Sequence, residues 1–290
     1  MLRQETRTVF FDNPEAGDDD TEPIKPRKPE SWAVIIGAGR YESQEVPRLR
    51  YAVPDAELLR QVLVGVGGFK PEHVLLLTDT ADRKPTLRNM KWALGTFLAR
   101  SAQKGDRVFI FFAGHGAPEV DREGVERDGV AKYLVPVDAE PDDLYATAFP
   151  MDELQTIFAR IEAERVLVFL DACYSGAAGG RTFAAKQMVM DESFLDRLAR
   201  AKGRAILAAS QPTEVALETA ELGHGLFSFY LGQGLKGPAD INKDGVITLQ
   251  ELYDYVQQQV TTKAQLLGGK QHPVLKGELD PTSPLVKLPM

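Results

Sequence analysis

VFIFFAGHG at residues 108–116 has the same design as VLVFLDACYSG at residues 166–176. Each segment is an apolar run of the length of a buried strand, and each run ends in small residues around one reactive side chain. His115 ends the first run, and Cys173, the only cysteine of the chain, ends the second. Sites in parallel α/β sheets form at the carboxyl ends of the strands. The two segments therefore predict neighbouring strands that present an imidazole and a thiol to each other, as a cysteine nucleophile requires.

Other strand-like runs alternate with helical patterns along the chain. Five strands are predicted from β-branched or aromatic runs that mostly lack polar alternation: residues 32–36, 73–77, 107–112, 165–170 and 204–208. Three helices are predicted from apolar spacing or from a proline that suits a first helical turn: residues 52–64, 85–101 and 151–162. This order predicts an α/β fold with a mostly parallel sheet of about six strands, helices on both faces and right-handed crossovers.

The organisation of the chain follows from shifts in composition. Residues 12–22 contain six acids and no basic residue, and three prolines follow, so residues 1–30 are predicted to be a disordered arm or linker. One domain is predicted for residues 31–290, made of a larger part, a linker loop and a smaller part: residues 31–176, 177–203 and 204–290. Residues 117–149 lack periodicity and are predicted to be a long functional loop.

Composition limits the classes of partner and compartment. The 290 residues carry a formal net charge of −8, which gives no reason to expect binding to nucleic acid or to an anionic membrane. No apolar run approaches the ~20 residues of a membrane span, and the first twenty residues lack the apolar core of a signal peptide. A single cysteine excludes an internal disulfide. We therefore expect a cytoplasmic protein with a free thiol; its oligomeric state is not indicated by the sequence.

The surroundings of Cys173 and His115 suit nucleophilic catalysis. The thiolate is the reactive form of cysteine, and a histidine ordinarily titrates near neutral pH, so it can act as the base. Gly116 lies directly after the histidine, and the backbone N–H groups of Gly116 and Cys173 are predicted to form an oxyanion hole. Taken singly, a buried small cysteine or a core histidine is the ordinary alternative. His224, which precedes a helical pattern, is predicted to be a loop or capping residue rather than the base.

The two loops resemble the motifs of a known family. Phe-Ala-Gly-His-Gly at residues 112–116 and Asp-Ala-Cys-Tyr-Ser-Gly at residues 171–176 resemble the motifs of caspase-like cysteine peptidases, particularly the metacaspase and bacterial caspase-like branch. The resemblance covers most of residues 31–260. It implies a caspase-like three-layer sandwich and cleavage of protein or peptide substrates by a dyad, here Cys173 and His115. It implies neither a catalytic third member nor a catalytic metal.

Two acids near these motifs bear on the substrate. Asp171 lies two residues before Cys173, and Asp55 lies at the start of the first predicted helix. In metacaspase-like members the matching acids line the pocket for the residue before the cut, so the resemblance implies cleavage after Arg, then Lys, by charge pairing. The alternative is that Asp171 caps the following loop and Asp55 its helix. Aspartate-specific caspases instead place an arginine shortly before the acid that matches Asp55, and Arg48 and Arg50 lie nearby but outside that register.

Residues 240–251 fit the template of a calcium-binding EF-hand loop at every diagnostic position. The predicted ligands are three side-chain oxygens, a carbonyl, a position that acts through water and a bidentate carboxylate: Asp240, Asn242, Asp244, Val246, Thr248 and Glu251. Gly245 lies where such a loop turns sharply. Gly234, Gly237 and Pro238 interrupt the helix that would normally enter the loop, so a plain helix cap is the alternative. The template predicts Ca²⁺ as a structural or regulatory ligand.

Two basic residues follow the cysteine motif. Arg181 and Lys186 lie in the predicted linker loop and are candidate self-cleavage sites for an enzyme that cuts after basic residues. An ordinary mobile loop is the alternative. For the whole chain, the alternative functions are a catalytically inactive caspase-fold module that binds a partner or senses calcium, and a thiol acyl-transferase such as a ligase.

Overall fold

The structure is a computed structural model, and it describes a large part of the chain: residues 27–121, 124, 129–172, 193–199, 202–211 and 214–289. Cys173, Arg181 and Lys186 therefore lie outside the described residues. In the part that is described, no helix combines the length and the apolar character needed to cross a membrane.

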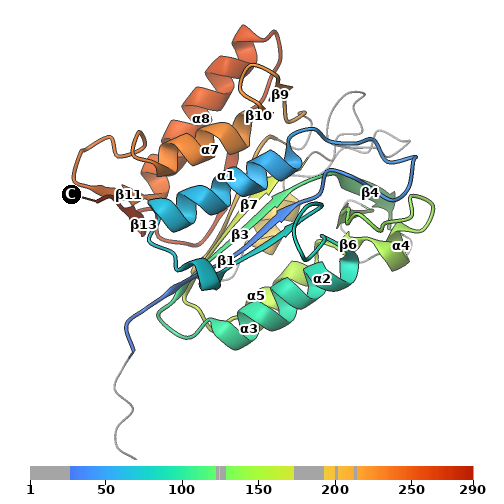
Figure 1. The fold of residues 1–290 in the computed structure, drawn as a ribbon, viewed down its shortest axis with the longest axis horizontal. Helices are drawn as coiled ribbons and strands as arrows, with labels where there is room; N and C mark the ends of the chain where they lie inside the picture. The colour runs from blue at the N-terminus through green and yellow to red at the C-terminus, as the bar shows by residue number, and fades with distance from the viewer. Residues whose placement is uncertain are drawn as a thin grey trace, which may run out of the picture.

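A six-stranded sheet forms the centre of the molecule, in the order β12-β8-β7-β3-β1-β2 (Figure 1). Its strands are β1 (Ser31–Gly37), β2 (Val74–Thr78), β3 (Arg107–Ala113), β7 (Arg165–Asp171), β8 (Arg204–Ala208) and β12 (Val274–Gly277). The first five are parallel, and β12 runs antiparallel to β8 at the edge of the sheet. The predicted mostly parallel α/β sheet is confirmed. The edge strand β12 escaped prediction because its four residues include Lys276 and Gly277 and are only partly buried.

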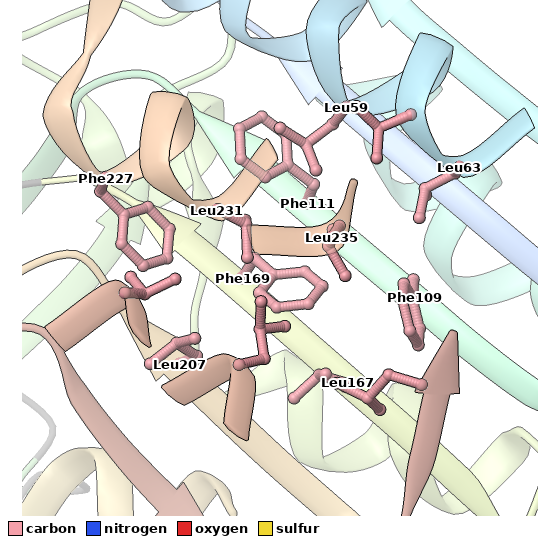
Figure 2. Close-up of a cluster of buried hydrophobic side chains, with 14 of the residues drawn as sticks. Leu59, Leu63, Phe109, Phe111, Leu167, Phe169, Leu207, Phe227, Leu231 and Leu235 are labelled. Carbon is pink, nitrogen blue, oxygen red and sulfur yellow. The ribbon is translucent and has the colours of Figure 1, made fainter. Parts of the chain in front are cut away.

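Alternate residues of the central strands point to opposite faces, and both faces are buried. On β3, for example, Phe109 and Phe111 belong to one core cluster, whereas Val108 and Ile110 belong to the other. Figure 2 shows the first cluster, where aromatic and leucine side chains of the sheet meet those of the covering helices. Burial on both faces explains why these strands are apolar runs without polar alternation.

Helices cover the sheet on both sides (Figure 1). One face carries α1 (Ala52–Gly65), α7 (Leu226–Leu235) and α8 (Leu249–Leu266). The other carries α2 (Leu87–Trp92), a π-helical turn (Ala93–Phe97), α3 (Leu98–Ser101), α5 (Glu153–Arg160) and α6 (Ser193–Leu198). The helix predicted to begin at Pro85 begins two residues later, because the Thr86 side chain accepts the Asn89 N–H at 3.3 Å and so caps the helix.

The prediction that residues 117–149 form a long loop is wrong. A separate antiparallel sheet, in the order β4-β5-β6, occupies much of this stretch. Its elements are β4 (Gly116–Val120), β5 (Val130–Leu134) and β6 (Phe149–Pro150), and α4 (Leu144–Thr147) precedes β6. Charged residues within these strands hide the pattern: Glu119 lies in β4, and the buried Lys132 lies in β5 just before the apolar residues Tyr133 and Leu134.

Four short strands and one helical turn complete the described elements. β9 (Glu218–Thr219) pairs with β10 (His224–Gly225), and β11 (Val246–Thr248) pairs antiparallel with β13 (Pro284–Lys287). The 3₁₀ turn η1 (Pro71–His73) precedes β2.

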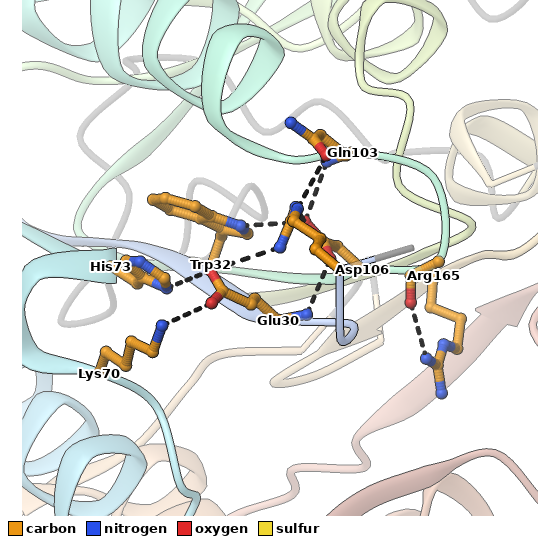
Figure 3. Close-up of polar contacts among 9 residues, drawn as sticks. Glu30, Trp32, Lys70, His73, Gln103, Asp106 and Arg165 are labelled. Carbon is orange, nitrogen blue, oxygen red and sulfur yellow. Dashed lines mark hydrogen bonds and ion pairs between the residues drawn. The ribbon is translucent and has the colours of Figure 1, made fainter. Parts of the chain in front are cut away.

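A buried carboxylate fastens the beginning of the described chain to the sheet (Figure 3). Asp106 accepts the backbone N–H groups of Glu30 at 2.8 Å and Gln103 at 2.9 Å. It also accepts the indole N–H of Trp32 at 3.1 Å and pairs with Arg27. Burial raises the pKa of Asp106, but the hydrogen bonds and the Arg27 guanidinium outweigh burial, so this pKa lies below its usual value.

We predict that Asp106→Asn lowers the free energy of unfolding by about 2 kcal/mol at pH 7, since buried donors lose a charged acceptor. Because the folded-state pKa is lowered, the carboxylate stabilises the protein above its unfolded-state pKa, and this contribution is lost as the pH falls through the folded value. The difference between variant and parent should therefore shrink below about pH 4. Urea unfolding at several pH values measures it, with exposed Asp82→Asn as control. Equal stability at pH 7 would contradict the role of Asp106.

Candidate active site

The carboxyl ends of β3 and β7 lie at the same level of the sheet. The two strands pair over their full length, and the register ends with Ala113 opposite Asp171. The Gly114 N–H donates to the carbonyl of Asp171 at 3.3 Å. His115 comes two residues after Ala113, and Cys173 comes two residues after Asp171. The neighbouring strands predicted from the two motifs are confirmed, whereas the dyad itself stays a prediction because Cys173 lies outside the described residues.

The imidazole of His115 is fully buried and held by a backbone carbonyl. Its Nε2 lies 2.7 Å from the carbonyl oxygen of Pro47. Since a carbonyl oxygen can only accept a hydrogen bond, Nε2 carries the hydrogen, and Nδ1 is the basic nitrogen of the neutral ring. A neutral imidazole with one basic nitrogen is the form of histidine that can accept a proton.

Neighbouring groups fix the backbone of the same histidine. The His115 N–H donates to the hydroxyl of Tyr41 at 3.0 Å, and this hydroxyl donates to the Ala38 carbonyl at 2.9 Å. Position 114 requires a glycine, because its backbone lies against the Phe112 ring and a Cβ there would lie 2.7 Å from that ring. The contribution of Pro47 had no signal in the sequence, because this residue acts through its carbonyl rather than through a side chain.

The two predicted substrate-binding acids are both fully buried at this edge of the sheet. Asp55, in the first turn of α1, lies with Oδ1 2.9 Å from Nδ1 of His224, and its carboxylate accepts the Gly225 N–H at 3.2 Å. Asp171, the last residue of β7, accepts the Ser228 hydroxyl at 2.5 Å. Asp55 does not cap α1, since the N-cap position is Tyr51.

One helical turn therefore contacts both carboxylates. Gly225 is the N-cap of α7, and Ser228 lies in the first turn of that helix. Negative charge is favoured at a helix N-terminus, where backbone N–H groups point outward. His224 is more than the predicted loop or capping residue, because it lies in β10 and its ring pairs with Asp55. The arrangement places two buried carboxyl groups around the first turn of α7.

Gly116, predicted to contribute to an oxyanion hole, is the first residue of β4. It is buried and lies opposite Leu134 of β5. The Val135 N–H donates to the carbonyl of His115 at 3.0 Å, so the segment that leaves the site is tied to β5. The role of Gly116 and Cys173 in an oxyanion hole stays a prediction.

The predicted calcium loop adopts a compact turn. Asp240 accepts the N–H groups of Asp244 at 3.2 Å and Gly245 at 3.0 Å, and Asp244 accepts that of Val246 at 2.8 Å. Asn242 accepts the Asp244 N–H at 2.9 Å. Gly245 has φ 82°, the left-handed conformation that the template requires.

The final ligand of that template has another partner. Oε2 of Glu251 accepts the N–H of Thr248 at 3.0 Å and its hydroxyl at 2.8 Å, forming a capping box at the start of α8. Glu251 thus takes part in a helix cap, and calcium binding by this loop stays a prediction. In the arrangement shown, no three His, Cys, Asp or Glu side chains of the described ranges are gathered closely enough to hold a metal ion. Calcium coordination by Glu251 would require its carboxylate to leave Thr248.

We predict that the neutral ring of His115 carries its hydrogen on Nε2, because this nitrogen contacts the Pro47 carbonyl. Nitrogen-15 NMR of the histidine rings, with His115→Gln to assign the signal, distinguishes the two tautomers. Tyr41→Phe should leave the tautomer unchanged, since Tyr41 contacts the backbone N–H of His115. Hydrogen on Nδ1 would contradict the proposed orientation of the base.

Comparisons with known proteins point to one family. The profile of a family described as "Caspase domain" matches residues 30–282. Metacaspase-1 of Eremothecium gossypii is 31% identical over 151 residues, which are 50% of this chain and 32% of that protein. Metacaspase-1 of Arabidopsis thaliana is 30% identical over 175 residues, 58% of this chain and 42% of that protein. This chain thus spans less than half the length of these curated relatives.

A solved structure has a similar fold. The crystal structure of protein GSU0716 from Geobacter sulfurreducens matches with a TM-score of 0.63 and 21% sequence identity. The match covers 90% of this chain and 98% of that one, so the similarity extends over nearly the whole architecture.

Proposed function

This chain belongs to the caspase domain family, and from that membership we propose that it is a cysteine endopeptidase that cleaves proteins after basic residues, Arg in preference to Lys. The observation that supports this most is the register of β3 and β7, which ends with Ala113 opposite Asp171. It brings the loop of His115 beside the strand that leads to Cys173.

The proposed mechanism uses the dyad in two half-reactions. Nδ1 of His115 takes the proton of the Cys173 thiol, and the thiolate attacks the carbonyl carbon of the scissile bond. Backbone N–H groups of Gly116 and Cys173 stabilise the resulting oxyanion. His115 then protonates the leaving amine, and a water that it deprotonates releases the acyl group from Cys173. The Pro47 carbonyl stabilises the imidazolium by accepting its Nε2–H.

The charges at this edge of the sheet support the preference for a basic residue. Asp55 and Asp171 are buried carboxylates around the first turn of α7. A guanidinium or ammonium group would be attracted to them, and a substrate carboxylate would be repelled. Arg48 and Arg50, the residues that could have favoured an aspartate, are exposed.

Turnover of matched fluorogenic peptides that end in Arg, Lys or Asp tests this proposal. We expect Arg to be cleaved fastest and Asp slowest. Cys173→Ala should abolish turnover, and His115→Gln should lower kcat roughly 10²- to 10⁴-fold because the general base is lost. A preference for Asp would overturn the assigned specificity, and turnover that persists in Cys173→Ala would point to a contaminating protease.

Self-processing is a further part of the proposal. Arg181 and Lys186 follow the cysteine motif and match the proposed specificity, although both lie outside the described residues. Intact-mass spectrometry of the parent and Cys173→Ala proteins from the turnover assay would show cuts after these residues in the parent alone.

We also propose that Ca²⁺ binds residues 240–251 and modulates the enzyme, because the loop has the template's oxygen ligands and its left-handed glycine. Titration calorimetry with Ca²⁺ should give a binding heat for the parent that is lost in Glu251→Gln. The matched control is Glu278→Gln, which makes the same change at an exposed position outside the loop and should keep the binding heat. Equal heats for parent and Glu251→Gln would remove calcium coordination by Glu251.

A further inference from the structure

We propose that His224 is a positioning residue that orients the carboxylate of Asp55 toward a basic substrate side chain. The inference rests on the proposed function, since it concerns how the same site recognises its substrate. Three residues that contact the carboxylates of Asp55 and Asp171 lie between positions 224 and 228, in β10 and at the start of α7.

The carboxylate of Asp55 receives two kinds of donor. The Gly225 N–H lies 3.2 Å from Oδ1 and 3.3 Å from Oδ2, so this donor is shared almost equally between the two oxygens. Nδ1 of His224 lies 2.9 Å from Oδ1 alone. The imidazole therefore acts on one oxygen only, and so favours one orientation of the carboxylate.

The imidazole is itself held in place. Its side chain is 21% exposed, whereas that of Asp55 is fully buried. The ring lies 6.1 Å from that of Phe229, and the His224 backbone pairs with Thr219 in the β9–β10 ladder. The paired backbone and the nearby Phe229 ring favour one position of the imidazole, and so one direction of its contact with Asp55.

The second acid, Asp171, also accepts a hydrogen bond from a residue at the start of α7. Asp171 accepts the Ser228 hydroxyl, one helical turn from His224 along the chain. A charged substrate group that approaches both acids meets carboxylates whose directions are already set. Preorganised charges discriminate better than mobile ones, because no reorientation cost is incurred on binding.

Replacing His224 by Asn or by Gln tests whether the position of the N–H donor matters, because each amide places its nitrogen near a different ring nitrogen of His224. The amide nitrogen of Asn can lie near the position of Nδ1, whereas that of Gln reaches toward the position of Nε2. His224→Asn should therefore preserve the contact with Asp55, and His224→Gln and His224→Ala should lose it. This contrast also serves if the alanine variant does not fold, because both amide variants retain a polar side chain.

The readout is the ratio of kcat/KM for peptides that end in Arg and in citrulline, which has the shape of Arg but no charge. In His224→Ala and His224→Gln we expect this ratio to fall about tenfold, mainly through KM for the Arg peptide, with recovery in His224→Asn. In an Asp55→Asn background, His224→Ala should cause little further loss, because the two residues act through one contact.

His73→Ala is the matched control, because His73 also lies near a carboxylate, 3.5 Å from Glu30, but precedes β2 at the opposite edge of the sheet. It should leave the ratio unchanged. An unchanged ratio in both His224→Ala and His224→Gln, with Arg turnover intact, would overturn the positioning role alone, as would an equal fall in His73→Ala. Absence of Cys173-dependent turnover of the Arg peptide by the parent would instead overturn the proposed function, and the role of His224 with it.

Discussion

The pairing of β3 with β7 is the constraint on which the rest of the site depends. Seven consecutive residue pairs join the strands, from Arg107 opposite Arg165 to Ala113 opposite Asp171. Since both strands are buried on both faces, a shift of register by one residue would turn every side chain to the other face. The core therefore fixes the level at which the two strands end. Because His115 and Cys173 follow these ends at equal spacing, the packing of apolar side chains sets up the chemistry proposed for the polar ones.

The chain after β8 contributes to the same edge through α7. Ser228, in the first turn of α7, contacts Asp171. Gly225 and His224, directly before this helix, contact Asp55. Segments far apart in the sequence therefore meet around these two acids. This turn also belongs to the hydrophobic core, because its residues Leu226 and Phe227 are fully buried. The contacts of this turn with the acids are thus connected to the same core that aligns the strands.

The elements that were predictable are those with a local pattern. Apolar runs indicated the five parallel strands, and the small residues after β3 and β7 marked the edge that carries His115. Contacts between distant segments had no such pattern: the Pro47 carbonyl acts without a side chain, and His224 lies 169 residues from Asp55. The calcium template identified residues with suitable oxygen atoms, but it could not show that the Glu251 carboxylate accepts hydrogen bonds from Thr248.

Covalent labelling of Cys173 by a peptidyl-Arg chloromethylketone is the most direct measurement of the central claim. The thiolate would displace chloride from the reagent, and mass mapping would locate the new thioether. The account predicts one label per chain on Cys173, formed faster than with the matching Asp reagent and slowed strongly in His115→Gln. Failure of Cys173 to react in the folded protein, or an unchanged rate in His115→Gln, would contradict the assignment of a dyad that recognises basic residues.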